Sequence, residues 1–324
     1  METHPLLVGA PSTSSAAGDP AKEAAKEAAT DDGGDRAPAS KEERKKAALY
    51  SGPRAIDVDV SLGNHQRYYG YRKKVEEAGA RGDARLKFLE DAWFRGRKCK
   101  DVGCNDGTFT MALAREFAPR FLVGVDADEG LVRAAQASVA QASRKHAEKW
   151  AGAALRAADA SEAGVLSHGP LPYPHNLWFE REDAAGEAAG STVAANDHSF
   201  DLVSAFSVTK WIHLNHGDAG LVRFFERVFE SLKPGGRFVY EPQPWKSYTK
   251  RRTKNASEAV RENFDAMRIR PADFPDVLKR VGFASVDLLG TPDDEKLPKG
   301  FRRPIFLATK GPENGGGTKK RPRE

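Results

Sequence analysis

The sequence predicts an α/β protein built on a mostly parallel, doubly wound sheet. From about residue 98, strand-like and helix-like runs alternate with short connections, which is typical of a parallel sheet covered by helices on both faces. A glycine-containing turn, Gly103 to Gly107, joins the first strand to the first helix. At the end of the fold, two strand-like runs follow each other without a helix between them, which predicts an antiparallel pair at the sheet edge.

Each expected element is an apolar run bounded by turn residues. The expected strands are Lys98 to Val102, Phe121 to Val125, Asn176 to Phe179, Phe200 to Phe206, Gly236 to Tyr240, Ala284 to Leu289 and Phe301 to Thr309. The expected helices are Thr108 to Phe117, Leu131 to about Trp150, Leu221 to Leu232 and Pro271 to Val281. Pro234, Gly235 and Gly236 end the third helix and lead into the next strand.

Low-complexity segments flank this folded part. Residues 1–48 are rich in Ala, Gly and charged residues, and 311–324 form a basic tail. Neither segment can bury enough apolar surface to offset its ordering entropy, so we expect both to be disordered. Residues 184–198 are expected to form a flexible insertion, which leaves one domain over residues 49–310.

Composition limits the class of protein. Of the 324 residues, 40% are hydrophobic and the net charge is +5, while no apolar run approaches the roughly 20 residues that a bilayer requires. Cys99 and Cys104 alone make neither a disulfide framework nor a zinc site. We therefore expect an intracellular protein without metal or membrane. The basic tail resembles a weak nuclear-import signal, so a nuclear location is expected, with a cytoplasmic one as the alternative.

Three successive strand ends carry residues suited to a nucleoside cofactor. Gly103 and Gly107 allow the backbone to approach a ligand at a helix N-terminus. Asp126, about 20 residues later, suits a ribose diol, and Glu182 with Asp183 ends the third strand. The glycine spacing is short of the three-glycine dinucleotide pattern, which counts against NAD. The combination resembles class I S-adenosylmethionine-dependent methyltransferases, which implies a Rossmann-like fold.

The segment Ser207 to Asp218 places Lys210, two histidines and an aspartate directly after a buried strand. Ligands bind at this edge of such sheets. The segment is equally compatible with a solvated loop anchored by Trp211. His213 is expected to be a structural histidine outside the catalytic set.

Further motifs narrow the family. These are Gly63 to Arg72, Arg85 to Leu89, Trp93 to Arg97, Val208 to Asn215 and Glu241 to Trp245. Together they closely resemble the methylphosphate capping enzymes of the bicoid-interacting-protein-3 family, over about residues 60–310. The resemblance implies transfer of a methyl group from S-adenosylmethionine to a 5′ terminal phosphate of RNA, the γ-phosphate of polymerase III small nuclear RNA in the capping enzyme proper. It also implies a substrate and cofactor lid at about 60–97.

The resemblance assigns roles residue by residue. The terminal phosphate would be held by Tyr68, Arg72 and Lys210. The cofactor would be bound by Tyr69, Arg85, Gly103, Cys104, Asn105, Asp126, Ala127, Asp183 and Phe206, with Arg85 on its carboxylate. RNA would be contacted by Gln243, Trp245, Lys250, Arg251 and Arg252. Methylation of an anionic phosphate needs no strong base, so these roles are positioning and electrostatics.

Some features depart from the family pattern, and some alternatives stay open. Lys100 stands at a normally apolar position of the first strand and needs solvent or an acidic partner. A monophosphate-specific RNA methyltransferase, an RNA-binding scaffold with a vestigial cofactor site, and a small-molecule methyltransferase are the competing interpretations. We expect a monomer, with ribonucleoprotein partners possible.

Overall fold

Seven strands form one sheet in the order β3-β2-β1-β4-β5-β7-β6. The computed structural model describes residues 83–157, 171–186, 198–253, 256–292 and 301–312. The strands are β1 (Lys98–Val102), β2 (Phe121–Asp126), β3 (Leu177–Arg181), β4 (Phe200–Phe206), β5 (Leu232–Glu241), β6 (Phe283–Gly290) and β7 (Ile305–Lys310). The first five run parallel, and β7 pairs antiparallel with both β5 and β6. This topology confirms the predicted doubly wound sheet with its antiparallel edge.

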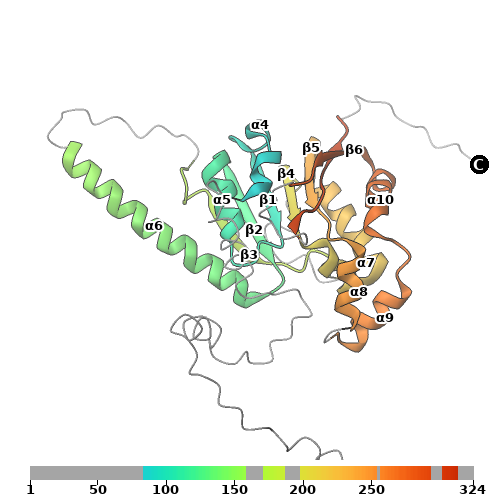
Figure 1. Cartoon of the computed structure of the whole chain (residues 1–324). Coiled ribbons are helices and arrows are strands. Elements are labelled where there is room, and N and C mark those ends of the chain that lie inside the picture. Colours follow the sequence, from blue (N-terminus) through green and yellow to red (C-terminus); the bar gives the residue numbers. More distant parts are fainter. Residues whose placement is uncertain (1–82, 158–170, 187–197, 254–255, 293–300, 313–324) are drawn as a thin grey trace, which may run out of the picture. The chain divides into compact units, whose positions relative to one another are not determined.

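The helices lie on both faces of the sheet (Figure 1). They are η3 (Ala84–Phe88), α4 (Asp91–Phe94), α5 (Thr108–Phe117), α6 (Glu129–Ala157), α7 (Thr209–Ser231), α8 (Trp245–Thr253), α9 (Glu258–Ala266), η4 (Pro271–Asp273) and α10 (Phe274–Val281). The face with α4 and α5 buries Phe94, Phe109 and Leu113 against the sheet. The strands in the middle of the sheet are therefore apolar on both sides, as in β4, where six of seven residues are buried.

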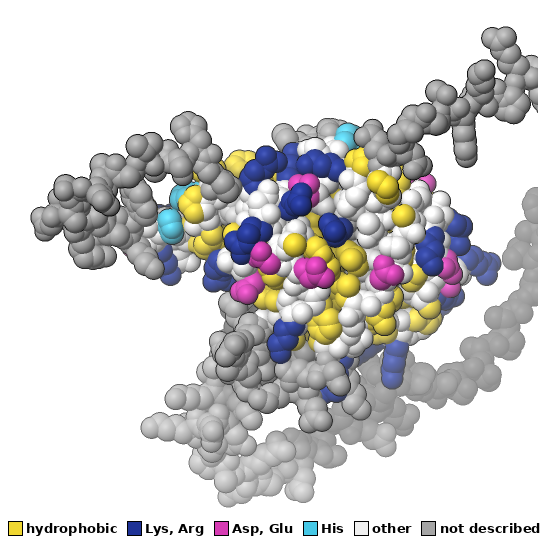
Figure 2. All heavy atoms as spheres, turned by 90° about the horizontal axis from the view of Figure 1, so that it is seen from above, with side chains coloured by type: hydrophobic (Ala, Val, Ile, Leu, Met, Phe, Trp, Pro, Cys, Tyr) yellow, Lys and Arg dark blue, Asp and Glu magenta, His cyan; other side chains and the backbone are white. Residues whose placement is uncertain are grey.

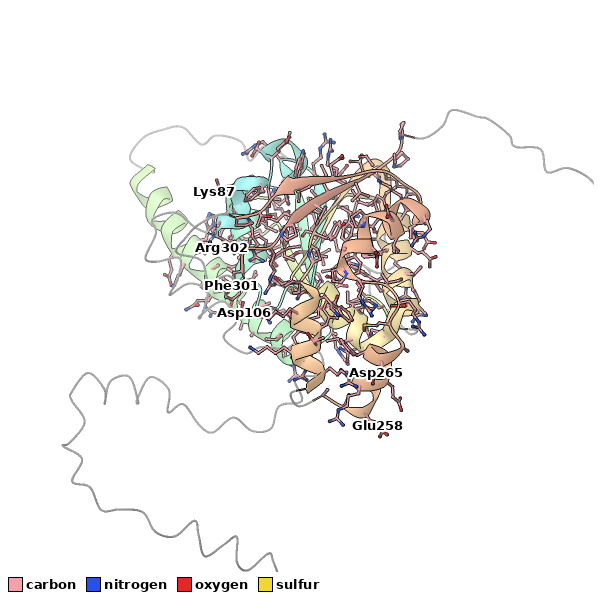
Figure 3. All side chains as sticks on the ribbon, turned by 45° about the vertical axis from the view of Figure 1, so that its right-hand side comes forward. Lys87, Asp106, Glu258, Asp265, Phe301 and Arg302 are labelled. Carbon is pink, nitrogen blue, oxygen red and sulfur yellow. The ribbon has the colours of Figure 1, made fainter. Side chains whose placement is uncertain are left out.

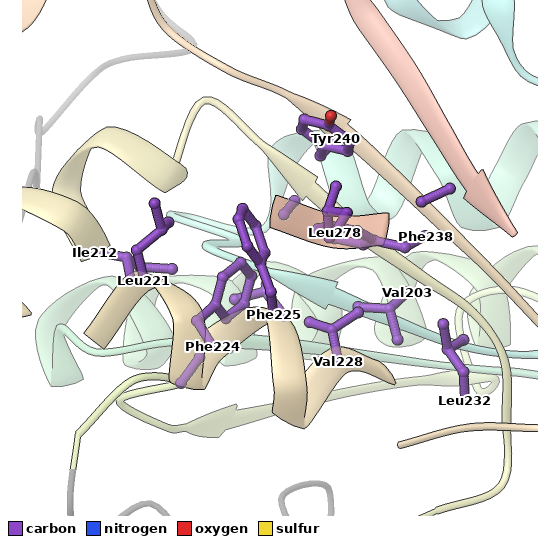
Figure 4. Close-up of a cluster of buried hydrophobic side chains, with 14 of the residues drawn as sticks. Val203, Ile212, Leu221, Phe224, Phe225, Val228, Leu232, Phe238, Tyr240 and Leu278 are labelled. Carbon is purple, nitrogen blue, oxygen red and sulfur yellow. The ribbon is translucent and has the colours of Figure 1, made fainter. Parts of the chain in front are cut away.

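Aromatic packing fills the other face, between the sheet and helices α7 and α10 (Figure 4). The ring centroid of Phe225 lies 6.2 Å from that of Phe238 and 5.6 Å from that of Phe274. This side chain of α7 therefore packs against both β5 and α10. Both pairs have the edge-to-face geometry that aromatic quadrupoles favour. This core fixes α7 on the sheet, and the first turns of α7 reach the site described below.

The segment Ser207 to Asp218 is helical from Thr209, so its interpretation as a loop is wrong. Trp211 and Leu214 are buried at helical spacing and pack against Tyr248 of α8 and Val260 of α9. The helix changes direction at Gly217, whose φ of 63° breaks the regular pattern. The basic residues Lys250, Arg251 and Arg252 are also helical, in α8. The packing of the first turns of α7 against α8 and α9 decides these conformations, and the local sequence pattern alone does not reveal it.

Several expectations fall on residues outside those described. They include the disorder of 1–48, most of the tail 311–324, the lid residues before 83, and most of the insertion 184–198. Both cysteines are buried and unpaired. In the ranges that the structure describes, no helix is long and apolar enough to cross a membrane.

Basic and acidic side chains are mixed on the face seen from the α4 and β6 end (Figure 2). Lysines and arginines there lie among aspartates and glutamates instead of forming one basic patch. Such mixing is typical of a solvated surface. A concentration of positive charge that could hold a polyanion must therefore be sought elsewhere.

Candidate functional site

An open pocket lies at the carboxyl ends of β1, β2 and β3, against the first turns of α7. Its empty space, counted out to the solvent at its mouth, is about 600 Å³. The pocket occupies the switch point of the sheet, where β1 leads to α5 on one face and β4 to α7 on the other. It is lined by Val102, Gly103, Asn105, Asp126, Ala127, Glu182, Asp183, Ala184, Val208, Trp211, Ile212, Asn215 and His216.

The glycine turn after β1 brings backbone close to this pocket. Gly103 has a φ of +77°, and a Cβ placed there would lie 2.5 Å from the Cβ of Val208, so only glycine lets the turn approach α7 this closely. Asn105 also has a left-handed φ, of 53°. Its buried Oδ1 has no hydrogen-bond partner among the described residues. Because buried acceptors are nearly always satisfied, a ligand donor is expected at this point of the pocket.

Asp126 ends β2 and holds the glycine turn in place. Its Oδ2 accepts a hydrogen bond from the Asn105 N–H at 2.9 Å, and its Oδ1 accepts one from the Asp128 N–H at 3.0 Å. Burial raises the pKa of Asp126 to about 6, while these backbone hydrogen bonds oppose the rise. Carboxylate oxygens can each accept more than one hydrogen bond, so Asp126 can also accept from ribose hydroxyls.

Asp183 lines the pocket together with His216 of α7. His216 Nε2 lies 3.1 Å from Asp183 Oδ1, within hydrogen-bonding distance. Partial burial works to raise the pKa of Asp183, but the hydrogen bond and charge of His216 lower it overall. Behind this pair, Lys100 donates to both oxygens of Glu182 at 2.8 Å. The buried lysine of β1 thus has the acidic partner that the sequence required.

Three predicted cofactor residues do not line the pocket. Cys104 is 1% exposed and packs with Phe179 under the turn, and Phe206 packs edge-on against Phe109 at 4.9 Å. Arg85 is fully buried, with Nη2 2.6 Å from Asp83 and its guanidinium 3.8 Å from the Phe109 ring centroid. Their contacts with a cofactor stay predictions. The other predicted cofactor residues among those described, Gly103, Asn105, Asp126, Ala127 and Asp183, come together in the pocket wall.

Lys210 lies in the first turn of α7, beside the pocket residue Trp211. Gln243 fixes this turn, because its Oε1 accepts from the Lys210 N–H at 3.2 Å and its Nε2 donates to the Ser207 carbonyl. The ammonium lies 4.1 Å from the Trp211 ring centroid. Burial, together with the smaller effect of the nearby charges of Arg303 and Arg251, lowers the pKa of Lys210 to about 7. No carboxylate in the described ranges pairs with it.

The sequence prediction missed Arg303, which precedes β7. Its Nη1 donates to Ser207 Oγ at 2.8 Å and lies 3.4 Å from Glu241 Oε1. β7 runs antiparallel to β5, so the start of β7 lies at the same sheet edge as the ends of the parallel strands. In the view of Figure 3, the neighbouring Phe301 and Arg302 lie between Lys87 and Asp106. The predicted antiparallel edge could have indicated this arginine.

Three of the predicted RNA-contacting residues are packed or paired with neighbouring side chains, while Lys250 and Arg251 have other surroundings. Gln243 is buried, Trp245 stacks on Tyr248 and Phe264 at 5.0 and 4.9 Å, and Arg252 pairs with Asp265 at 2.8 Å, so all three hold the helices together. Arg251 lies 5.6 Å from the Trp211 ring centroid, and its charge lowers the pKa of Lys210.

Lys250 is exposed on α8. Tyr68, Tyr69 and Arg72 lie outside the described residues. His213 is fully buried and contacts Asp218 at 2.6 Å, which agrees with a structural role.

Two protein-family models match the chain. The model for a methyltransferase domain matches residues 101–238, which include the glycine turn, Asp126 and Lys210. The model described as bicoid-interacting protein 3 (Bin3) matches residues 200–310, which include Lys210, α8 and Arg303. Together with the strand order, the first match shows the class I S-adenosylmethionine-dependent methyltransferase fold.

Characterised relatives extend this likeness over most of the chain. The 7SK snRNA methylphosphate capping enzyme of Mus musculus is 33% identical over 77% of this chain, which spans 40% of the relative's length. The U6 snRNA methylphosphate capping enzyme Amus of Drosophila melanogaster is 34% identical over 78% of this chain and 76% of its own length. An RNA 5′-monophosphate methyltransferase of Mus musculus is 29% identical, over 52% of this chain and 55% of its own length.

Proposed function

Because the chain belongs to the bicoid-interacting protein 3 (Bin3) family, we propose that it uses S-adenosylmethionine to methylate the 5′ terminal γ-phosphate of a small nuclear RNA. Polymerase III transcripts are the proposed substrates, since they keep a 5′-triphosphate. The observation that carries the proposal is the cationic cluster of Lys210, Arg251 and Arg303 beside the cofactor pocket. We further propose that the protein acts as a monomer and meets its RNA within ribonucleoproteins.

The hydrogen-bonding groups of the pocket suit the proposed cofactor. Asp126 provides acceptors for ribose hydroxyls, and the unpartnered Asn105 Oδ1 provides another buried acceptor. The backbone of the glycine turn forms one wall of the pocket and packs so closely on Val208 that a Cβ at Gly103 would lie 2.5 Å from it. Asp183, steadied by His216, would accept from the adenine amino group. These residues would hold the nucleoside, while Lys210 lies on the neighbouring turn of α7.

The chemistry requires positioning more than proton transfer. When bound, S-adenosylmethionine supplies a methyl group on a sulfonium, and a phosphate oxygen that is anionic near neutral pH can accept it without a base. Lys210 and Arg251 would neutralise and orient the phosphate so that one oxygen faces the methyl carbon. Gln243 would fix the position of Lys210, because its Oε1 accepts a hydrogen bond from the Lys210 backbone N–H. A low-dielectric site strengthens these charge contacts.

The relatives favour the capping reaction over the monophosphate reaction. The capping enzymes align over about three quarters of the chain at 33–34% identity, whereas the mouse RNA 5′-monophosphate methyltransferase aligns over 52% at 29%. The cluster of cations also suits the larger charge of a triphosphate. A monophosphate substrate remains the second candidate.

We expect the protein to transfer methyl groups to RNA with a 5′-triphosphate at least tenfold faster than to the same RNA with a 5′-monophosphate. The reason is that the cations at Lys210 stabilise a triphosphate more than a monophosphate. The measurement is incorporation of labelled methyl groups into one short RNA prepared with either end, with the product position mapped by nuclease digestion.

The controls for this assay separate the competing functions. RNA with a 5′-hydroxyl must remain unlabelled, because it offers no terminal phosphate. Labelling of monophosphate RNA alone would replace the capping proposal with the monophosphate one. Tight RNA binding without any transfer would instead support a scaffold, and transfer without RNA binding would point to a small-molecule substrate.

Exposed lysines on α8 are expected to contact the RNA body without reading its sequence. Replacing Lys246 and Lys250 together with glutamine should weaken RNA binding and reduce the salt dependence of the binding constant. For single strands each lost phosphate contact lowers the slope of log K against log salt by about 0.7, so the double variant should lower it by about 1.4. The measurement is fluorescence anisotropy between low and physiological salt.

The matched control removes the same charge from α10. Lys279 and Arg280 are exposed in the last turn of that helix, and neither lowers the pKa of Lys210 as Arg303 and Arg251 do. A double variant Lys279→Gln and Arg280→Gln should keep the wild-type slope. Equal slopes for both double variants would show that α8 has no special part in RNA binding.

A further inference from the structure

Cations from three separate segments converge next to the cofactor pocket. Lys210 lies in the first turn of α7, Arg251 belongs to α8, and Arg303 precedes β7. Lys210 and Arg251 approach the same Trp211 ring, at 4.1 and 5.6 Å from its centroid. Arg303 and Arg251 are both close enough to Lys210 to lower its pKa. A protein gains nothing in stability by crowding like charges, so such a cluster is typical of a site for an anion.

Arg303 is held at this site by two acceptors on neighbouring strand ends. Ser207 Oγ accepts from Arg303 Nη1 at 2.8 Å, and Glu241 Oε1 lies 3.4 Å from the same nitrogen. Ser207 adopts an uncommon left-handed φ of 61°, which the surrounding contacts must maintain. The guanidinium side chain is 13% exposed. These contacts fix the position of a long side chain that would otherwise lose considerable entropy on binding a ligand.

Glu241 carries one negative charge against the three cations Lys210, Arg251 and Arg303. It lies beside Arg303, while its other neighbour, Arg85, makes a shorter ion pair with Asp83, at 2.6 Å. Among the described residues, the cations around Ser207 and Lys210 therefore outnumber the carboxylates. A guanidinium carries five N–H donors in a planar fork, so its hydrogen bond to Ser207 does not prevent it from reaching a phosphate oxygen.

We propose that Arg303 is a substrate-binding residue that contacts the terminal phosphate together with Lys210, and that Ser207 and Glu241 aim its guanidinium. This inference rests on the proposed function, since it assigns a further residue to the same phosphate site. It also gives the C-terminal antiparallel edge a direct part in the site, because Arg303 leads into β7.

The inference is tested with Arg303→Gln, Arg303→Lys and the control Arg280→Gln on α10. We expect Arg303→Gln to raise the KM for triphosphate RNA about tenfold or more, since a charge-assisted hydrogen bond is lost. Arg303→Lys should recover part of this loss, because it restores the charge without the fork. Arg280→Gln should match the wild type. Calorimetry should show binding of S-adenosylhomocysteine within twofold of wild type in all variants.

A purely structural role would not change the pH profile. Arg303 and Arg251 are the charged groups that lower the pKa of Lys210, so Arg303→Gln should move the alkaline fall in kcat/KM to higher pH. A KM within twofold of wild type, or a loss that comes with weaker cofactor binding and is not improved in Arg303→Lys, would overturn the inference.

The proposed function can fail separately from this inference. If the wild type methylates neither triphosphate nor monophosphate RNA, the proposed function is wrong. The contribution of Arg303 is then decided by calorimetric titration of the full chain with inorganic tripolyphosphate. Binding that weakens about tenfold in Arg303→Gln supports the site, and unchanged binding rejects it.

Discussion

Replacing Lys210 with alanine should lower kcat/KM for triphosphate RNA by about 100-fold. Lys210 lies beside the cofactor pocket, and its first-turn position is fixed by Gln243. A hydrogen bond to a charged group contributes about 1.5–3 kcal/mol, and the loss of electrostatic stabilisation during transfer adds to it. Each 1.4 kcal/mol is a factor of ten. Steady-state methyl transfer measures this effect.

The pH dependence identifies the charge of Lys210 as the cause. Its pKa is lowered to about 7, so the free protein carries the ammonium below pH 7 and loses it above. Phosphate binding requires the charged form, so kcat/KM should fall with rising pH above about 7, up to tenfold per unit. Below about pH 6 we expect kcat/KM to fall as the pH decreases, since a terminal phosphate then takes up its second proton. Lys210→Arg should lose the alkaline limb, because a guanidinium keeps its charge.

Two controls accompany this experiment. Lys246→Ala removes an exposed lysine of the neighbouring helix α8 and should leave the alkaline limb in place. Binding of S-adenosylhomocysteine to Lys210→Ala should stay near wild type, because the assigned nucleoside contacts come from Asp126 and Asp183. An unchanged kcat/KM in Lys210→Ala would remove Lys210 from the phosphate site.

The sheet could be predicted from the sequence because its strands leave little ambiguity. Lys98 to Val102 and Phe200 to Phe206 are found at their predicted bounds, since each is buried on both faces and ends at a polar turn. A parallel sheet brings the ends of such strands to one edge. Gly103, Asp126 and Asp183 therefore meet in one pocket although about 80 residues of sequence separate the first from the last.

The parts that sequence reasoning missed depend on side-chain direction and on tertiary contacts. Cys104 and Phe206 flank the correct strand ends, and their contacts with a cofactor stay predictions, but their side chains turn into the core, a direction that residue type does not reveal. Trp211 looked like the anchor of a loop, while its packing against α8 and α9 makes it part of a helix. Arg303 lies at this edge because β7 runs antiparallel beside β5, and the sequence predicts an antiparallel edge but not which strand pairs with β5.

Gly103→Ala should abolish measurable cofactor binding, with a loss of affinity above 100-fold. The φ of +77° alone costs an alanine about 1–2 kcal/mol. The new Cβ would also lie 2.5 Å from Val208 Cβ and Cγ2, and real carbon contacts are more than half an ångström longer. Val208 lines the pocket and precedes the turn that carries Lys210. Relieving the clash would therefore displace the glycine turn, the first turn of α7, or both. Calorimetry with S-adenosylhomocysteine measures the affinity, and thermal unfolding measures the stability.

Gly235→Ala separates backbone strain from the clash. Gly235 has almost the same conformation, with a φ of +74°, but a Cβ there meets nothing within 4 Å. This variant should lower Tm by only a few degrees, since about 1–2 kcal/mol in a domain of this size corresponds to that shift, and it should bind cofactor normally. Gly103→Ala should lose more stability than Gly235→Ala and, unlike it, should lose the cofactor. Equal behaviour of the two variants would mean that the close approach of Gly103 to α7 has no part in forming the pocket, and the cofactor site would have to be placed elsewhere along the sheet edge.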